Sequence, residues 1–281
     1  MNFRTLSLVM LAVLGTPTLL HAQHAGHTTA APTSSAALDQ AIAGSWRTPA
    51  NVLRDKYRHP QQTLSFFQIK PNQTVIEITP GGGWYSEILA PYLRDQGHYI
   101  AAVVDPSALP AGGGRDYQQR NFDSLKKKFE AAPAQYDKAQ MAPYAPATPS
   151  FGAPASADLV LTFRNVHNWR KAGQAEGMFK GFYDVLKPGG VLGVVEHRAT
   201  KDVPADDDTG YVGVAQVIAL AEAAGFKLDE QSEVNANPRD TKDHPNGVWT
   251  LPPTNQHDAK DDAKYQAIGE SDRMTLRFVK P

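Results

Sequence analysis

The 281-residue chain contains no cysteine. This absence excludes thiolate nucleophiles, disulfide bonds and cysteine-ligated zinc sites. It also excludes a lipid anchor attached to a cysteine near the N-terminus. Without disulfides the protein depends on its hydrophobic core for stability, and a chain of this length with 41% hydrophobic residues is sufficient for one.

The chain also lacks an excess of charge of either sign, with 28 basic residues against 29 acidic ones. Domains that bind DNA, RNA or an anionic membrane surface usually carry a clear basic patch. The balance gives no support for a nucleic-acid partner, and a small-molecule ligand is expected instead. The sequence itself sets no oligomeric state.

No hydrophobic run is long enough for a comfortable transmembrane span, and the main one lies at the N-terminus. Arg4 precedes an apolar stretch over residues 6–20, which a glycine and a proline interrupt, and Ala22 is a small residue suited to cleavage. This pattern predicts a signal peptide over residues 1–22, and the alternative is an N-terminal anchor that is retained. After cleavage we expect a periplasmic or secreted protein with no stable membrane insertion.

The rest of the chain divides into a leader and one domain. Residues 23–35 are small and polar without periodicity, which predicts a disordered leader, and residues 36–281 are expected to fold as a single domain. Helical spacing over residues 36–70 predicts a helical N-terminal cap, with a second short helix starting near Pro60. The polar residues 54–58 between these helices are candidates for a site, but an exposed loop face is the favoured interpretation.

Beyond the cap, segments of strand character alternate with segments of helical character. Strands are predicted over residues 74–78, 99–104, 140–144, 158–163, 191–196, 227–234 and 274–279, and helices over 84–93, 117–131, 172–186 and 212–224. This alternation predicts an α/β fold with a mostly parallel sheet. Such sheets bind ligands beyond the carboxyl ends of their strands, so the residues after each strand are candidates for a site. Residues 235–268 form an excursion that is expected to lie over that edge like a lid.

The first predicted strand leads into the loop Glu77-Ile78-Thr79-Pro80-Gly81-Gly82-Gly83. Consecutive glycines let the backbone turn tightly and approach a ligand closely. The helix that follows offers free N–H groups and the positive end of its dipole. Glu77 is unusual, because an acid at the end of a buried strand is costly without a partner. We expect it to accept hydrogen bonds from the loop amides or from a cationic group of a ligand.

This loop resembles the cofactor loop of class I S-adenosylmethionine (SAM) methyltransferases, in which an acid precedes glycines at alternate positions. Glu77, Gly81 and Gly83 match that pattern, whereas Thr79 stands where the first glycine is usual. The turn at 186–190 and a closing strand over 272–280 are also similar to that family. The segments 54–60, 75–93 and 237–240 together resemble a group of exported bacterial predicted methyltransferases.

The resemblance implies a Rossmann-like methyltransferase sheet with an antiparallel C-terminal strand, and SAM as the cofactor. Asp105, which follows the second strand, would bind the ribose hydroxyls through its carboxylate. Asn165 is a candidate to hold the amino-acid end of SAM, and Arg164 to bind a carboxylate. The cofactor-binding residues are therefore expected to be Glu77, Thr79, Pro80, Gly81, Gly82, Gly83, Asp105, Arg164 and Asn165.

Three residues near the ends of later strands are the catalytic candidates. His167 follows the fourth strand and is a candidate general base, unless it packs at the start of a helix. Glu196 and His197 end the fifth strand. A carboxylate–imidazole pair would make the histidine more basic, but neighbouring residues on a strand point to opposite faces, so each is a separate candidate. A metal site built from His167, His197 and a carboxylate is the less favoured alternative, and no metal is expected.

The function favoured by these features is an exported SAM-dependent methyltransferase of a small molecule, in which His167 or Glu196 deprotonates the acceptor. An alternative is a methyltransferase fold reused as a non-catalytic ligand-binding module. Three features favour this non-catalytic alternative. Thr79 replaces the usual glycine, the third strand over 140–144 lacks a terminal acid, and the predicted signal peptide implies export from the compartment in which SAM is made. A nicotinamide-dependent enzyme is a third candidate, because Gly81-x-Gly83-x-x-Ser86 nearly matches a dinucleotide fingerprint. In the excursion, Asp243 and His244 are expected to belong to a solvated charged loop.

Overall fold

One seven-stranded sheet organises the protein, with the strand order β3-β2-β1-β4-β5-β7-β6. The computed structural model describes Met1 and residues 34–281; the predicted signal peptide and all but two residues of the predicted leader lie outside the described residues. The strands are β1 (Thr74–Ile78), β2 (His98–Val104), β3 (Gln140–Tyr144), β4 (Ala157–Phe163), β5 (Leu186–His197), β6 (Lys227–Ser232) and β7 (Arg273–Val279).

The strand directions confirm the predicted mixed sheet. Strands β1 to β5 pair in parallel, with β1 between β2 and β4. Strand β7 lies between β5 and β6 and is antiparallel to both. Each predicted strand is present within one or two residues, except that β5 begins earlier, at Leu186, which pairs with Ala157. The carboxyl ends of the five parallel strands therefore share one edge of the sheet.

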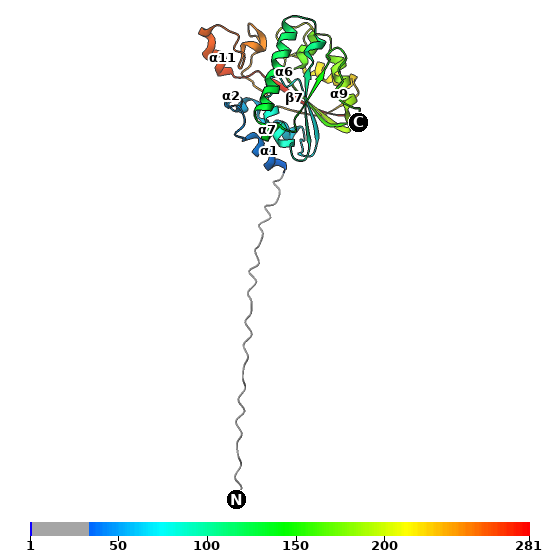
Figure 1. The fold of residues 1–281 in the computed structure, drawn as a ribbon. Helices are drawn as coiled ribbons and strands as arrows, with labels where there is room; N and C mark the ends of the chain where they lie inside the picture. The colour runs from blue at the N-terminus through cyan, green and yellow to red at the C-terminus, as the bar shows by residue number, and fades with distance from the viewer. Residues whose placement is uncertain (2–33) are drawn as a thin grey trace. The chain divides into compact units, whose positions relative to one another are not determined.

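Helices cover both faces of the sheet, as Figure 1 shows with α6, α7 and α1 on one side and α9 on the other. The helices are α1 (Ser34–Ile42), α2 (Pro49–Val52), α3 (Asp55–Arg58), α4 (Pro60–Phe66), α5 (Ser86–Leu93), α6 (Gly113–Ala131), α7 (Pro133–Tyr136), α8 (Val166–Lys171), α9 (Ala175–Val185), α10 (Val214–Ala223) and α11 (Asp262–Ile268), with short 3₁₀ turns η1 (Pro106–Ala108), η2 (Gly247–Thr250) and η3 (Ala259–Asp261).

Alternation along the strands divides the buried side chains into two cores. On β1, Val75 packs in the core beneath α1, α4, α5 and α6, whereas Ile76 and Ile78 pack in the core beneath α9 and α10. Glu77 therefore points to the same side as Val75, toward α5. The carboxylate is buried there because the strand period of two leaves it no other direction.

The N-terminal cap is helical as predicted, but it consists of four short helices, and the first begins at Ser34. Leu64 and Phe67 are fully buried in the core on the α5 side of the sheet. A Cβ added to Gly193 of β5 would lie 2.7 Å from the Phe67 ring, so this glycine lets the cap approach the sheet closely. The indole of Trp84 donates to the carbonyl of Asn51 at 2.9 Å. The cap thus packs against the sheet and against the segment that follows β1.

One further feature differs from the sequence-based expectation. The segment after β4 forms a separate helix, α8, which the pattern did not predict. The excursion 235–268 holds η2, η3 and α11, and residues from it reach the carboxyl edge of the sheet. Among the described residues, no helix is both long and apolar enough to cross a membrane.

Candidate functional site

Two adjoining cavities lie at the carboxyl edge of the parallel strands, with volumes of about 360 Å³ and 680 Å³. Both volumes fall in the range of small-molecule sites. Thr79, Asn165, His167 and Trp249 line both cavities, which therefore lie side by side. The smaller one extends toward the cap and β7, so we call it the cap cavity. The larger one extends over the ends of β2 and β3, and we call it the sheet-edge cavity.

The glycine loop borders the cap cavity with its backbone. Gly81 and Gly83 have φ values of +57° and +78°, which side-chain-bearing residues rarely adopt. A Cβ added at Gly81 or Gly82 would meet no atom within 4 Å, whereas one added at Gly83 would lie 2.8 Å from Leu125. Gly83 is thus required for packing against α6. Gly81 and Gly82 keep the loop surface bare where it faces the cavity.

Thr79 occupies a position at which glycine is favoured, with a φ of +51°. A β-branched residue in the left-handed region is strained. Its hydroxyl oxygen lies 2.7 Å from that of Tyr144 at the end of β3, and its amide donates to the Ala102 carbonyl at 2.8 Å. These two bonds offset the strain and tie the loop to β2 and β3. The end of β3 therefore supplies a tyrosine hydroxyl that supports the cofactor loop.

Glu77 is buried, and its Oε2 accepts hydrogen bonds from the Ser86 hydroxyl at 2.9 Å and the Tyr99 hydroxyl at 2.6 Å. Among the described residues no loop amide donates to it, so the expectation of amide partners was wrong. Burial raises the pKa of Glu77 to about 7, because two hydroxyl donors compensate only part of the lost hydration. The residue lines the cap cavity. A carboxyl group placed in this way is suited to a cationic ligand group.

Asp105 follows β2 directly, and its Oδ1 accepts hydrogen bonds from the backbone amide and hydroxyl of Ser107 at 2.8 and 2.7 Å. These bonds lower its pKa, so the carboxylate is ionised and its Oδ1 side is engaged by the η1 turn. The neighbouring Val104 lines the sheet-edge cavity together with Leu109 and Tyr144. Asp105 thus lies beside an apolar wall, and its ribose-binding role stays a prediction.

Asn165 and Arg164 differ in how much of their side chains is free. The Asn165 amide donates to the Ile78 carbonyl at 3.1 Å and to the Thr162 hydroxyl at 3.2 Å, which ties β4 to β1. Arg164 has a φ of +62°, and its side chain is 26% exposed. Its guanidinium donates no hydrogen bond to any described residue and lies 3.7 Å from Glu270. Arg164 is therefore the freer of the two donors at the cavity wall.

The candidate base His167 forms a pair with Glu196, not with its neighbour along β5. Its Nδ1 lies 3.1 Å from Oε1 of Glu196, which is fully buried. The carboxylate also accepts from the backbone amides of Val166, His167 and His197, at 2.6, 3.3 and 2.7 Å. A proton on Nδ1 would leave Nε2 with its lone pair on a residue that lines both cavities. No hydrogen bond joins the Glu196 carboxylate to the His197 ring among the described residues, although their ligand atoms lie within 4.8 Å of each other.

His197 forms a different contact, with its Nδ1 2.5 Å from the Ser271 hydroxyl. Burial, the nearby His167 and several arginines lower its pKa well below the usual value, so the ring is neutral. Ligand atoms of His167, Glu196 and His197 lie within 4.8 Å of one another, as in a possible metal site. The four donors on the Glu196 carboxylate already occupy its lone pairs, so this arrangement favours a base over a metal ligand.

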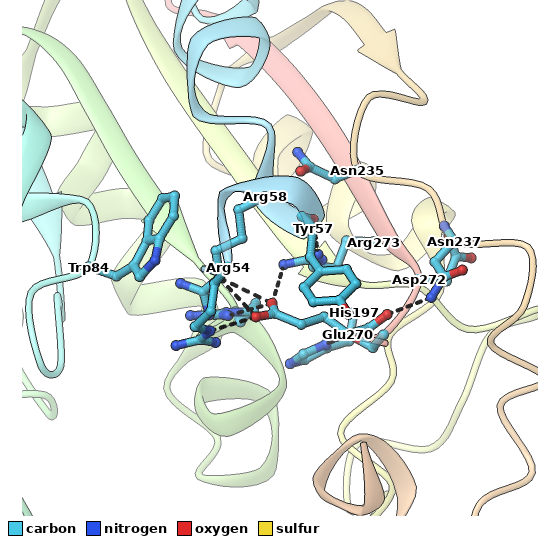
Figure 2. A network of polar contacts seen from close by, with 12 residues as sticks. Arg54, Tyr57, Arg58, Trp84, His197, Asn235, Asn237, Glu270, Asp272 and Arg273 are labelled. Atoms are coloured by element: carbon cyan, nitrogen blue, oxygen red, sulfur yellow. Dashed lines mark hydrogen bonds and ion pairs between the residues drawn. The ribbon is translucent and has the colours of Figure 1, made fainter. Parts of the chain in front are cut away.

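A second charged cluster beside the cap cavity was missed by the sequence reasoning. Glu270, buried just before β7, contacts four arginines. Figure 2 shows three of them, Arg54, Arg58 and Arg273, around its carboxylate. The contacts are Arg54 Nε at 2.7 Å, Arg273 Nη1 at 3.0 Å, Arg58 Nε at 3.1 Å and Arg164 Nη1 at 3.7 Å. Despite burial, these cations lower the pKa of Glu270 to about 2.

The placement of Arg54 and Arg58 corrects the interpretation of residues 54–58 as an exposed loop face. Arg58 is only 1% exposed, and its guanidinium carbon lies 4.7 Å from the centroid of the Trp84 ring. Both arginines line the cap cavity. The charge and spacing of Arg54 and Arg58 are visible in the sequence. Glu270, the acid that both contact, lies more than 200 positions further along the chain.

The segment 270–273 is held by polar contacts from the excursion. The side-chain amide of Asn237 donates to the carbonyls of Ile268 and Glu270 at 2.9 and 2.7 Å. Asp240 accepts from the Asp272 amide at 2.7 Å and from His244 Nε2 at 2.8 Å. His244 is therefore buried, and its assignment to a solvated loop was wrong. The 237–240 motif positions Glu270 and does not itself face the cavity.

The same excursion also supplies one wall of the cap cavity. Val248, Trp249 and the pair Pro252-Pro253 line it. The Trp249 and His167 rings meet edge to face, with centroids 5.9 Å apart. An apolar wall thus covers the candidate base, which reduces its access to water.

No protein-family model matches the chain, and no curated protein matches it. Similarity appears among solved structures. A SAM-dependent methyltransferase from Aquifex aeolicus superposes with a TM-score of 0.51 and 14% identity, over 87% of this chain and 98% of that one. The [4+2]-cyclase SpnF superposes with a TM-score of 0.55 and 15% identity, over 89% and 98%. The protein has a class I methyltransferase-like fold. At such identities the likeness extends to the fold alone.

Proposed function

We propose that this protein is a SAM-dependent methyltransferase that acts on a small-molecule acceptor. The observation that carries the proposal is the loop after β1, where Glu77 and the bare backbone of Gly81 and Gly82 face the cap cavity. SAM presents a cationic amino group, a carboxylate and an aromatic base. The two adjoining cavities offer Glu77 for the first, Arg164 for the second, and the apolar residues around Val104 for the third. The residues therefore fit the group.

When bound, SAM would supply an electrophilic methyl group. The chain's own contribution would be to hold the acceptor beside that methyl and to remove a proton from it. His167 is the candidate for the proton, because Glu196 fixes the ring and stabilises the imidazolium that forms. Positioning in a cavity covered by Trp249 would supply most of the rate enhancement.

Calorimetric titration with SAM and with its demethylated product, S-adenosylhomocysteine (SAH), tests the proposal directly. We expect one site per chain for each compound, and weaker binding by a Gly81→Val variant. A protein that binds neither compound while remaining folded would refute the proposal. A parallel titration with NADH and NADPH examines the nicotinamide alternative, and no signal is expected there.

A second candidate is the use of this fold as a ligand-binding module or for different chemistry. The likeness to SpnF, a cyclase, favours keeping it, because one fold supports several reactions. The His167–Glu196 pair discriminates between the two functions, since a binding module needs no general base. An His167→Gln variant that binds SAH normally, but turns over no acceptor in an assay where the wild type forms SAH, would support the enzyme.

Export is a further part of the proposal and rests on the N-terminal pattern of Arg4, the apolar stretch 6–20 and Ala22. Expression with a C-terminal tag, cell fractionation and N-terminal sequencing of the product test it. We expect a product that starts near residue 23 in the periplasmic or secreted fraction. A cytosolic product with an intact N-terminus would contradict export.

A further inference from the structure

The cluster around Glu270 has more positive charge than it can neutralise. Four arginines contact one carboxylate, so three positive charges remain uncompensated within the cluster. Two other acids lie near the same cavity. Burial raises the pKa of Glu77 to about 7, and Glu196 is engaged by His167 and three backbone amides. Among the described residues neither acid forms an ion pair with these arginines, although the charge of Arg164 acts on Glu77 and partly lowers its pKa.

The arginines have donors left over as well as charge. Arg54 uses its Nε on Glu270, and Arg164 makes no hydrogen bond to a described residue. Their side chains are 22% and 26% exposed, and both line the cap cavity. Behind them, Nη1 and Nη2 of Arg58 are buried without any hydrogen-bond partner among the described residues. A planar guanidinium is well suited to hold a carboxylate or a phosphate through two parallel bonds.

The arrangement is costly as it stands. Buried like charges repel one another, and burial lowers the pKa of Arg164 to about 10. A buried charge cluster that lacks a counterion is retained at the expense of stability, and a bound anion would relieve it. The cost therefore points to a ligand that brings negative charge.

We propose that the methyl acceptor carries an oxyanion, a carboxylate or a phosphate, that binds to Arg54 in the cap cavity, while Arg164 holds the carboxylate of SAM. This inference rests on the proposed methyltransferase function. At Arg54 the carboxylate of SAM is the competing occupant. SAM as a whole carries a net positive charge, because its sulfonium adds to a balanced amino-acid end. It would therefore leave most of the excess uncompensated, which argues for a second anion.

The test measures the binding of two probe anions, inorganic phosphate and benzoate, to the purified protein by calorimetry, with and without saturating SAH. We expect one saturable site that tolerates SAH, and the tighter probe identifies the oxyanion. The variant Arg54→Gln should weaken binding at least about tenfold, the loss of one charge-assisted contact. Arg54→Lys keeps the positive charge but lacks the planar guanidinium, so its anion affinity should lie between those of the wild type and Arg54→Gln.

A matched control is Arg120→Gln, which removes an exposed arginine on α6. Its anion affinity should equal that of the wild type. SAH affinity within a factor of two of wild type shows that Arg54→Gln remains folded. Unchanged anion binding in Arg54→Gln would overturn the inference, as would the absence of saturable binding of both probes. Competition between the anions and SAH would overturn it too, because Arg54 would then hold the cofactor's carboxylate.

The two proposals fail separately in this design. Anion binding that depends on Arg54 in a protein that does not bind SAH would refute the methyltransferase function and leave an anion site. SAH binding without any anion site would leave the methyltransferase function and refute the oxyanion acceptor.

Discussion

Two buried glutamates face the same cavity, and their environments shift their pKa values in opposite directions. Glu77 receives two hydroxyl hydrogen bonds, and its pKa rises to about 7. Glu270 contacts four arginines, and its pKa falls to about 2. Desolvation acts on both in the same sense, so the partners decide the outcome. The region around Glu77 is suited to bind a cationic group. The region around Glu270 has an excess of positive charge and is suited to bind an anion.

The comparison also concerns how the two regions are built. Glu77, Gly81 and Gly83 lie within seven consecutive residues, and their geometry follows from a local strand–loop–helix unit. The arginines and Glu270 come from the cap, the end of β4 and the segment before β7. The Glu77 region is visible in the sequence as a motif because its residues are consecutive. The Glu270 region is not, because it depends on the packing of segments that are distant along the chain.

The largest expected effect is the loss of the counterion in the arginine cluster. Glu270→Ala should lower the free energy of unfolding by about 3–5 kcal/mol, because the arginines would remain buried without their acid. Urea unfolding at pH 7 measures this. The control Glu233→Ala removes an acid whose side chain is 73% exposed and pairs with Arg198, and it should cost less than about 1 kcal/mol. Equal losses in the two variants would contradict the assigned role of Glu270.

Next comes the pH dependence of stability at Glu77. Its folded pKa lies above the unfolded value, so its contribution is most favourable below pH 4.5 and is lost as the pH rises through about 7. The shift corresponds to about 3 kcal/mol. Glu77→Gln, compared with wild type by urea unfolding at pH 5 and pH 8, should gain relative stability by up to that amount at the higher pH. The control Glu130→Gln, on the exposed side of α6, should show no such trend.

Glu270 predicts the opposite trend in acid. Its folded pKa lies below the usual value, so its contribution is full above pH 4.5 and is lost as the pH falls toward 2. The wild type should lose stability between pH 5 and pH 3, and Glu270→Gln should lose less over the same interval. Parallel curves for the two proteins would show that the arginines do not hold this carboxylate ionised.

A smaller effect is expected at the bare loop. Gly81→Val places a β-branched side chain at a φ of +57° and fills the space that the loop leaves open. A strain of about 1–2 kcal/mol together with the added bulk should weaken SAH binding at least about tenfold. Calorimetry measures the affinity. Unchanged affinity would show that the loop does not contact the cofactor.

The smallest effect concerns the bond between Tyr144 and Thr79. Tyr144→Phe should cost about 1 kcal/mol of stability, because it removes the bond that offsets the strain at Thr79. The control is Tyr136→Phe, since Tyr136 is a buried residue whose side chain forms no hydrogen bond found among the described residues. Urea unfolding measures the loss of stability in both variants. An equal loss in Tyr136→Phe would contradict the role of the Tyr144 hydroxyl in supporting the loop.

Much of the fold was predictable because its signals are local. The strand–helix alternation predicted all seven strands, and the resemblance to class I methyltransferases implied the antiparallel strand β7. The glycines at 81–83 predicted a tight backbone turn, and Gly81 and Gly83 have positive φ values that favour glycine. Period-two and helical patterns record which face of each element is buried, and burial is the main constraint on a strand or a helix. Helix α8 was missed because one and a half turns leave little periodicity.

The sequence by itself thus determined the sheet, the edge at which a ligand would bind and the loop that would border it. Only the tertiary structure decided which polar groups meet there. Glu196 and His197 are neighbours on β5, yet the Glu196 carboxylate pairs with the ring of His167 and the His197 ring contacts Ser271. Arg58 and Glu270 are joined across 212 positions, and Thr79 depends on Tyr144 across 65. Such pairs produce no periodic pattern in the sequence. Each forms only because two elements that are distant along the chain end close together in the fold.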